Sequence, residues 1–447
     1  MKAIYLVTVA MLAGCATTSP MLQPKVEPAA AYSERATPAA APVTAQWWKT
    51  FGSAELQTLV DEALAGSPDL AIAMERVRQA EAQVKVAGAS LFPVLSAGYS
   101  TRKTNASASS SGVSLAASYE VDMWGRNAAG VRAAQADLRA TTFDRDTVRL
   151  TLLSGVATAY FQALSLRARV ANARENLGIA ERVLGLVQAR ARNGAASPLD
   201  VARQEATVLS QRGALLPLEQ FERQTLAALA VLIGRVPEGF ELKASNLAGV
   251  AVPSIDPGLP ADLLLRRPDL ASAEAQLAAG NADLAAARAA LLPSIQLTGS
   301  AGMASSALLA VLNAPVSTLA IAASVLQPIF DGGRLKGQIA IAESRERELV
   351  ESYRKAILTA FADVEQALAA ASRLGEREAL QAQVLERARE SLRLAEVRYR
   401  EGADDLLTVL DAQRTLFDAQ DQLAQVRRDR LESAVALYKA LGGGWSV

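Results

Sequence analysis

The sequence predicts a mixed protomer that combines long coiled-coil helices with four membrane β-strands, and three observations support this fold class. Proline-free segments with helical apolar spacing run from residue 127 to 193 and from residue 334 to 401. Short segments of alternating apolar and small or polar residues, typical of β-strands, precede both. The motif Pro68-Asp69-Leu70-Ala71 returns as Pro268-Asp269-Leu270-Ala271. A helix of this length would extend roughly 100 Å, about three times the thickness of a bilayer core.

Composition argues against most catalytic classes. The chain contains no histidine and one cysteine, which removes the commonest general base and metal ligand and any intramolecular disulfide. No glycine-rich phosphate loop occurs where a strand meets a helix. Acidic and basic residues both number 46, and no basic block suited to nucleic acid is present. We therefore expect no enzyme activity, no cofactor, no metal site and no nucleic-acid partner.

The N-terminal segment predicts export from the cytoplasm. A positively charged start and a short apolar segment predict that residues 1–14 are a signal peptide. Leu12-Ala13-Gly14-Cys15 resembles a bacterial lipobox, which implies acylation of Cys15, and the following Ala16 implies delivery to the outer membrane. The alternative is an ordinary signal peptide with an incidental cysteine. Residues 15–46 are rich in Ala, Pro, Ser and Thr and are expected to form a lipid-anchored flexible tether.

The first structural repeat is expected over residues 47–253, beginning at Trp47-Trp48. We expect first a helix over 55–91 that ends before Pro93, and then a β-hairpin over 94–122 with strands at 94–103 and 113–122. A long helix over 125–193 follows and ends in a turn at Gly194. A return helix over 198–233, which Pro217 interrupts or kinks, leads into a connector.

The alternation in the hairpin leaves two interpretations open. Strands of about ten residues have the length of a tilted outer-membrane strand. A hairpin that is half-buried against a soluble core would show the same alternation. The neighbouring helices offer no surplus of apolar residues to cover such a sheet, which favours the membrane interpretation.

The second repeat is expected over residues 254–447, with a helix over 261–291, a hairpin over 294–328 with strands at 294–303 and 318–327, a long helix over 333–401 and a return helix over 404–441. Its landmarks match those of the first repeat: Leu91-Phe92-Pro93 returns as Leu291-Leu292-Pro293, Trp124-Gly125-Arg126 as Gly332-Gly333-Arg334, and Gly194 as Gly402. This order of matches indicates a tandem duplication.

At both turns, apolar and small residues at alternating steps of three and four predict antiparallel coiled coils. In the first, Val170, Ala173, Leu177, Ala180, Leu184, Val187 and Ala191 would face Leu199, Ala202, Ala206, Leu209, Gly213 and Leu216. In the second, Leu385, Ala388, Leu392, Ala395 and Tyr399 would face Leu406, Val409, Leu416 and Leu423.

Four strands cannot close a membrane barrel, because the smallest barrels have about eight. An open sheet in lipid would leave unpaired backbone groups at both edges. If the strands cross a membrane, the chain must therefore oligomerise, and three copies would supply twelve strands.

Five motifs carry a resemblance to a known family: Trp47-Trp48, Asp122-Met123-Trp124-Gly125-Arg126, the run from Gly258 to Asp269, Phe330-Asp331-Gly332-Gly333-Arg334, and Leu410-Asp411-Ala412-Gln413-Arg414. They resemble the outer membrane factor family, specifically the TolC-like lipoprotein branch of RND-type multidrug efflux systems (NodT-type). The resemblance implies a homotrimer with a 12-stranded barrel in outer membrane lipid and a periplasmic α-barrel. It also implies a passive exit duct that meets a periplasmic adaptor (membrane fusion) protein and an inner-membrane pump.

The candidate site is the narrow end of such a tunnel. Leu407, Asp411, Arg414, Asp418 and Asp421 share one face of the second return helix. In a trimer with this face inward, Leu407 would form an apolar constriction and Asp411 a ring of carboxylates, which are features that gate pores. Read alone, the stripe is a solvated face.

The resemblance assigns roles at both tips. Leu407 and Asp411 match the periplasmic gate, with Arg414 beside them, and Asp200 and Tyr399 match a hydrogen-bonded pair that helps to hold the closed state. Gly194 and Gly402 mark the tips that contact the adaptor. Asp404 stands where some relatives have a basic residue, so the full closed-state network cannot be transferred.

Other functions stay open at this point. Metal-ion or protein export could use the same architecture, and a lipid-anchored periplasmic coiled-coil adaptor without a pore would share the heptads and Cys15. The sequence does not distinguish drugs, solvents, dyes and siderophores as cargo.

Overall fold

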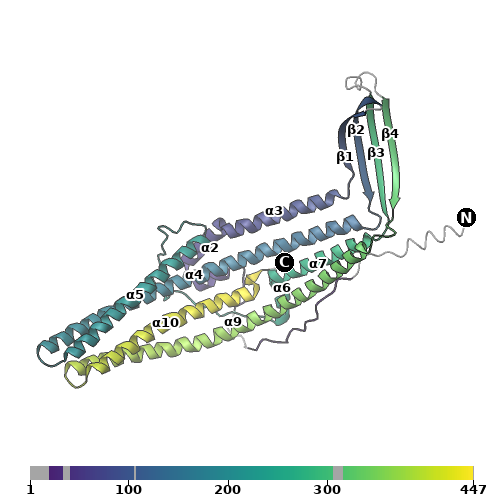
Figure 1. The fold of residues 1–447 in the computed structure, drawn as a ribbon. Coiled ribbons are helices and arrows are strands. Elements are labelled where there is room, and N and C mark those ends of the chain that lie inside the picture. Colours follow the sequence, from purple (N-terminus) through teal and green to yellow (C-terminus); the bar gives the residue numbers. More distant parts are fainter. Residues whose placement is uncertain (1–19, 34–40, 105–106, 306–315, 446–447) are drawn as a thin grey trace. The chain divides into compact units, whose positions relative to one another are not determined.

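The computed structural model describes residues 20–33, 41–104, 107–305 and 316–445. Its longest elements are two helices of 67 residues, α4 (Arg126–Arg192) and α9 (Arg334–Arg400), and two helices of 35 residues, α5 (Pro198–Leu232) and α10 (Leu406–Ala440) (Figure 1). The long helices are one residue shorter at each end than expected, and α10 begins two residues later, after its N-cap Asp405. The duplication is therefore visible in the equal lengths of matching helices.

The chain forms two compact units, and each takes parts of both sequence repeats. Among the described residues, the first unit contains those within 75–144 and 269–356, together with residues 20–26. The second contains residues 27–74, 145–268 and 357–447.

The first unit contains one four-stranded antiparallel sheet in the order β1-β2-β3-β4. Its strands are β1 (Val94–Thr104), β2 (Ser107–Val121), β3 (Ser294–Ser305) and β4 (Val316–Leu326). Pairs such as Val113 with Met303 and Leu115 with Ala301 join the two hairpins across the repeats. Strand β2 begins six residues earlier than expected, because serines at its start pair with β1, as Ser111 does with Thr101.

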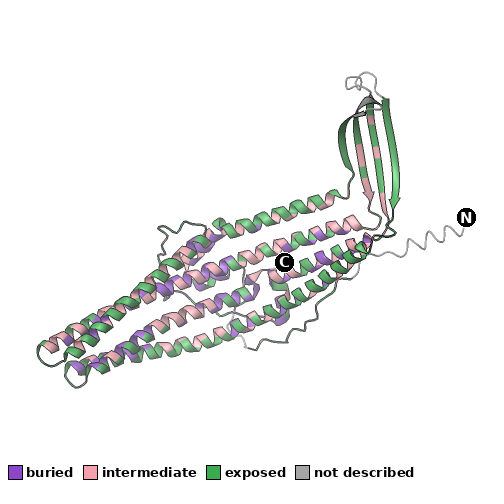
Figure 2. Ribbon diagram, viewed as in Figure 1, coloured by how far each residue is buried: buried purple, intermediate pink, exposed green. Residues whose placement is uncertain are grey.

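The sheet keeps its large apolar side chains on the surface of the single chain. Leu95, Tyr99, Leu115, Leu319 and Ile321 are all exposed, and the strands are largely exposed in Figure 2. Buried positions instead follow the helices.

Polar side chains fix the junction between the sheet and the two long helices. The Asp122 carboxylate accepts hydrogen bonds from the backbone N–H groups of Asn127 (3.0 Å) and Ala128 (2.7 Å), which caps α4. Asp331 caps α9 in the same way, through Gly333 (3.0 Å) and Leu335 (2.9 Å).

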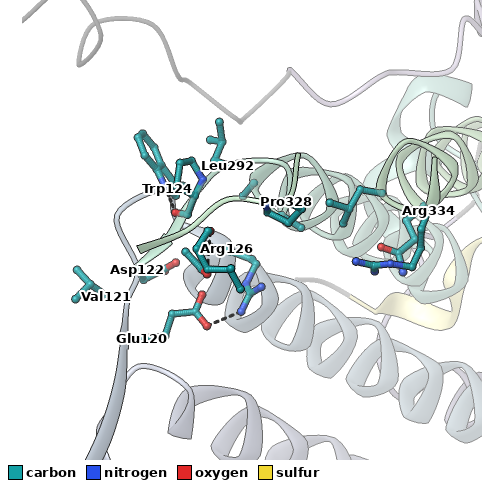
Figure 3. A pocket seen from close by; sticks show the side chains of 15 residues that line it. Glu120, Val121, Asp122, Trp124, Arg126, Leu292, Pro328 and Arg334 are labelled. Atoms are coloured by element: carbon teal, nitrogen blue, oxygen red, sulfur yellow. Dashed lines mark hydrogen bonds and ion pairs between the residues drawn. The ribbon is translucent and has the colours of Figure 1, made fainter. Parts of the chain in front are cut away.

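Beside this junction is a cavity of about 310 Å³, lined in part by Glu120, Trp124 and Arg126 (Figure 3). Arg126 and Glu120 form an ion pair at 2.6 Å. The Trp124 indole donates to the carbonyl oxygen of Pro293 (2.7 Å), so this side chain ties the first hairpin to the second.

The single helix expected over residues 55–91 is wrong, because the chain forms α2 (Ala54–Gly66) and α3 (Pro68–Ala89). The helix expected over 261–291 is likewise divided into a 3-10 turn (Pro260–Asp262), α6 (Leu263–Arg266) and α7 (Pro268–Ala289). The cause is the same in both repeats. Ser67 and Arg267 precede a proline, which disfavours helical backbone at these positions, and both are extended. Helix α5, by contrast, continues through Pro217.

Each return helix ends on a glycine that touches the short helix of its own repeat. Gly234 and Gly442 have φ of 75° and 81°. A Cβ at Gly234 would lie 2.0 Å from the carbonyl oxygen of Gly66, and one at Gly442 would lie 1.7 Å from that of Arg266. Only glycine fits either position, both for its backbone angle and for its lack of a side chain.

An aromatic cluster forms part of the core of the second unit. Trp47 and Trp48, in the short helix Trp47–Phe51, are buried where the folded structure was expected to begin. The ring of Trp47 stacks on that of Tyr438, with 5.1 Å between the ring centres. The ring centres of Phe51 and Phe161 are 5.0 Å apart. The start of the body is thereby packed against α4 and α10.

Part of the segment expected to be a tether contacts the body. The backbone N–H of Ser33 donates to Glu365 (3.0 Å), and Ala41 pairs with Ile255. Burial raises the pKa of Tyr32 to about 12. Cys15 and the predicted signal peptide lie outside the described residues. Within the described part of the chain, no helix is both long and apolar enough to cross a membrane.

Candidate functional site

The chain reverses at both tips through the same hydrogen-bonded turn. Gly194 and Gly402 have φ of 73° and 78°, a region that glycine enters without steric cost. Two hydrogen bonds close each turn: Gly194 donates to Ala191 (3.0 Å) and Ala195 to Arg190 (2.8 Å), and Gly402 donates to Tyr399 (3.1 Å) and Ala403 to Arg398 (2.9 Å). This Schellman pattern satisfies the last carbonyl groups of α4 and α9.

Acidic side chains fix the start of each return helix. Ser197 and Asp200 form a capping box, in which the Ser197 N–H (2.9 Å) and hydroxyl (2.8 Å) both donate to Oδ2 of Asp200. These backbone and side-chain hydrogen bonds hold the pKa of Asp200 below its usual value, so the carboxylate is ionised at neutral pH. At the second tip, the Asp405 carboxylate accepts from the N–H of Thr408 (3.1 Å).

Asp404, the acidic residue two positions after Gly402, has a partner across its own turn. Its carboxylate accepts two hydrogen bonds from Arg398, at 2.6 and 3.1 Å. The hydrogen bond to Arg398 lowers the pKa of Asp404. The ion pair spans the Gly402 turn and joins the end of α9 to the segment before α10.

The two helical hairpins, α4–α5 and α9–α10, pack against each other through α4, α9 and α10. Their shared core includes Val183 and Val187 from α4, Leu392 from α9, and Val409 and Leu416 from α10. The predicted stripes on α9 and α10 lie in this core, with Leu423 partly buried at its margin. The predicted α4 stripe is buried or half-buried along its length.

The stripe predicted on α5 is wrong for the single chain, because Leu199, Leu209 and Leu216 are 56%, 64% and 66% exposed. Helix α5 instead turns Gln204 and Val208 toward the body. The buried Gln204 amide donates to the carbonyl oxygen of Ala180 on α4 (2.8 Å). A polar residue at the contact breaks the apolar pattern, so the heptad count selected the wrong face.

The charged face of α10 is solvent-accessible, as its spacing predicts. Leu407 is 51% exposed, and the side chains of Asp411 and Arg414 are 67% and 75% exposed. These two form an ion pair at 2.7 Å. Farther along, Asp421 pairs with Arg169 of α4 at 2.5 Å. The face offers one apolar side chain near the tip, followed by paired charges.

Arg190 is the tip residue that sequence reasoning missed. From the last turn of α4, its guanidinium donates to the backbone carbonyl oxygen of Tyr399 and lies 4.5 Å from the centre of the Tyr399 ring. A second nitrogen donates to the carbonyl oxygen of Ala195 (3.4 Å). A lone arginine near a turn gives no signal by itself, because its partner is 209 residues away.

Tyr399 is buried, and the structure places it near Asp200 without a hydrogen bond between them among the described residues. Burial raises the pKa of the Tyr399 hydroxyl; the Arg190 charge lowers it and the Asp200 charge raises it. Asp200 is therefore close enough to act electrostatically, while the ring and carbonyl of Tyr399 contact Arg190.

This arrangement of a four-stranded sheet and paired coiled-coil hairpins agrees with comparisons to known proteins. The family model described as outer membrane efflux protein matches residues 59–235 and 259–443, which together make up most of the chain. The chain belongs to the outer membrane efflux protein family. The two matched segments correspond to the two repeats.

Curated members of the outer membrane efflux protein family are similar over nearly the whole chain. The pyoverdine export outer membrane protein OpmQ of Pseudomonas aeruginosa is 44% identical over 416 residues, which cover 90% of this chain and 87% of OpmQ. The solvent efflux pump outer membrane protein SrpC of Pseudomonas putida is 35% identical over 469 residues, covering 100% of this chain and 99% of SrpC.

Solved outer-membrane channels have the same fold. The outer-membrane channel OprN superposes with a TM-score of 0.87 at 27% identity, covering 96% of this chain and 100% of OprN. The open state of the Neisseria gonorrhoeae MtrE outer membrane channel superposes with a TM-score of 0.86 at 31% identity. The match covers 96% of this chain and 98% of MtrE.

Family membership confirms the predicted fold class, that of a trimeric channel, and the predicted location in the outer membrane. The protein is an efflux channel subunit of a tripartite system, and the members of its family are transport components. The alternative of a coiled-coil scaffold without a pore is set aside.

Proposed function

We propose that three copies of the chain form a passive exit duct whose periplasmic end closes at the helical tips, with Leu407 and Asp411 lining the constriction. The observation that supports this proposal is the exposed face of α10 beside the Gly402 turn, where Leu407 precedes a stripe of charged residues. Three copies of Leu407 would form an apolar ring, and three Asp411–Arg414 pairs would form a charged ring behind it.

The gate is tested by single-channel conductance in planar bilayers. The double variant Leu407→Ala/Asp411→Ala is expected to raise conductance at least about two-fold, because it removes both the apolar ring and the carboxylate ring. Glu386→Ala is the matched control, since Glu386 is an exposed acidic residue on α9 that also pairs with an arginine three positions on. Unchanged conductance in the double variant would remove these residues from the gate.

The partners follow from the tripartite systems to which the relatives belong. We infer that the tips at Gly194 and Gly402 contact a periplasmic adaptor, which links the duct to an inner-membrane pump. Supporting this inference, both turns are exposed and offer backbone in a fixed conformation. Cysteines introduced at Ala195 and Ala403 should cross-link to the adaptor in cells, and failure at both positions would contradict the inference.

Acylation of Cys15 is proposed from the lipobox-like sequence at residues 12–15. Two or more acyl chains would hold the protein at a membrane even without the sheet. The mass of the mature N-terminal peptide tests this proposal, and an unmodified Cys15 or an N-terminus elsewhere would overturn it.

A siderophore is the proposed cargo, because the chain is more similar to OpmQ, named for pyoverdine export, than to SrpC, named for solvent efflux. Expression in a Pseudomonas aeruginosa strain that lacks OpmQ should restore pyoverdine secretion. A correctly inserted trimer that restores none would contradict the proposal.

A further inference from the structure

Arg190 contacts the first tip and the second tip at the same time. It belongs to the last turn of α4, and through Ala195 it contacts the turn that follows its own helix. Its other contacts, the ring and carbonyl oxygen of Tyr399, belong to the last turn of α9. One side chain therefore links the two helical hairpins of a single protomer beside the proposed constriction.

Arginine suits this position for two physical reasons. The carbonyl groups at a helix C-terminus carry partial negative charge, so a cation at the end of α9 is stabilised there. The flat guanidinium also stacks on an aromatic face while its edge donates hydrogen bonds. Tyr399 provides both features, since its ring is buried against Arg190 and its carbonyl lies in the last turn.

The Asp200 carboxylate is already used by its own helix. Its Oδ2 atom accepts two hydrogen bonds from Ser197, which fix the start of α5. A hydrogen bond from the Tyr399 hydroxyl is therefore not needed to hold Asp200 in place. Tyr399 shares an apolar core with Val183 and Val187 of α4, and its polar contact with the first helical hairpin, among the described residues, is the one with Arg190.

We propose that Arg190 is a positioning residue of the gate, which holds the α9–α10 hairpin closed against α4 through the ring and backbone carbonyl of Tyr399. Opening moves one hairpin away from the other and separates Arg190 from Tyr399. The Tyr399 hydroxyl has no part in this clamp. The inference rests on the proposed gate, because the clamp acts by keeping Leu407 and Asp411 at the constriction.

The test compares four variants of the full-length trimer by single-channel recording. Tyr399→Leu removes the ring contact but keeps the backbone carbonyl, and we expect the open-to-closed ratio of each protomer to rise about three-fold. Arg190→Gln removes the guanidinium from both the ring and the carbonyl, so its ratio should rise at least as much. If the three protomers open together, the channel ratio rises roughly 30-fold. Tyr399→Phe keeps the ring and the carbonyl and should behave as the unmodified protein. Arg190→Lys keeps the charge without the planar group and should give an intermediate ratio.

Combining Arg190→Gln with Tyr399→Leu separates a clamp from general loosening of the tip. Because Arg190→Gln already removes both contacts of the clamp, the double variant should open no more than Arg190→Gln alone. Additive effects would overturn the proposal, as would a Tyr399→Phe channel that opens as readily as Tyr399→Leu, since the hydroxyl would then carry the contact. Trimer mass and thermal midpoint are measured for each variant, and only correctly assembled trimers are compared.

The Leu407→Ala/Asp411→Ala channel distinguishes this inference from the proposed function. If that channel conducts more while the Arg190 and Tyr399 variants remain unchanged, the gate stands and the clamp is wrong. If none of these variants changes the recording, the gate itself is misplaced.

Discussion

At the residue scale, the Asp200 carboxylate is held by Ser197 at the start of α5. Two hydrogen bonds from Ser197 end on the same carboxylate oxygen, and the N–H of Asp200 donates back to the Ser197 hydroxyl (3.2 Å). The hydrogen bonds that Asp200 accepts stabilise its ionised form, which is why its pKa is lowered.

The lowered pKa of Asp200 predicts how the first tip responds to acid. Because the folded pKa is depressed, the contribution to stability is complete above the unfolded value of about 3.9 and is lost as the pH falls through the lower folded pKa. Hydrogen-exchange protection of the first turn of α5, corrected for intrinsic rates, should stay constant from pH 7 to about 4 and fall below it. Asp200→Asn should remove this acid dependence. A loss of protection centred near pH 6 would show that another group controls the turn.

The residues of the candidate site differ in how visible they are in the sequence. The shared face of Leu407 and Asp411 follows from their spacing, whereas their assignment to the gate, like that of Asp200 and Tyr399 to the closed state, comes from the family resemblance. Arg190 could not be found this way, because its role comes from a helix end that lies in the other repeat. The Asp404–Arg398 pair was also missed, since a turn with opposite charges on both sides has no distinctive sequence pattern.

At the element scale, the sequence predicts the helices well and their faces less well. Apolar spacing and the absence of proline define α4 and α9 to within one residue at each end. The break at Ser67 could have been predicted, because the Pro68 motif that reveals the duplication is also the cause of the break. The rotated face of α5 could not, because the buried Gln204 reads as a surface residue until its partner on α4 is known.

The glycines that end the return helices give a prediction at this scale. Gly234→Ala should lower stability by about 3 kcal/mol or more, because it combines left-handed backbone strain with a collision against the backbone of Gly66. Gly239→Ala is the control: φ there is 74° but nothing lies within 4 Å of its Cβ, so the cost should be about 1 kcal/mol. Thermal midpoints of the purified trimers measure the difference, and equal shifts would contradict the role of the close contact.

At the scale of the whole molecule, the exposed stripe on α5 matters for assembly. A row of exposed apolar side chains on one helix face indicates an interaction surface. In a trimeric channel, we expect a neighbouring copy of the chain to cover this stripe. The heptad prediction that this row packs on α4 is wrong, because Gln204 makes that contact instead.

Leu209→Lys is expected to weaken the trimer, because it places a charge in the middle of this stripe, where a neighbouring chain would have to desolvate it. Ser210→Lys adds the same charge one position away, outside the stripe, and should leave the trimer intact. The mass of the detergent-extracted protein, corrected for bound detergent, decides the question. A trimer that survives Leu209→Lys unchanged would show that α5 contributes little to assembly.

The matched helix lengths restrict how such a protein can evolve. Helices α4 and α9 have 67 residues each, and α5 and α10 have 35 each. An insertion in one helix would shift the register of its coiled coil and move one turn away from the other. Substitutions can accumulate independently in the two halves, whereas a viable change of length must come as a multiple of about seven residues in all four helices at once. Length should therefore vary far less than sequence among descendants of the original duplication.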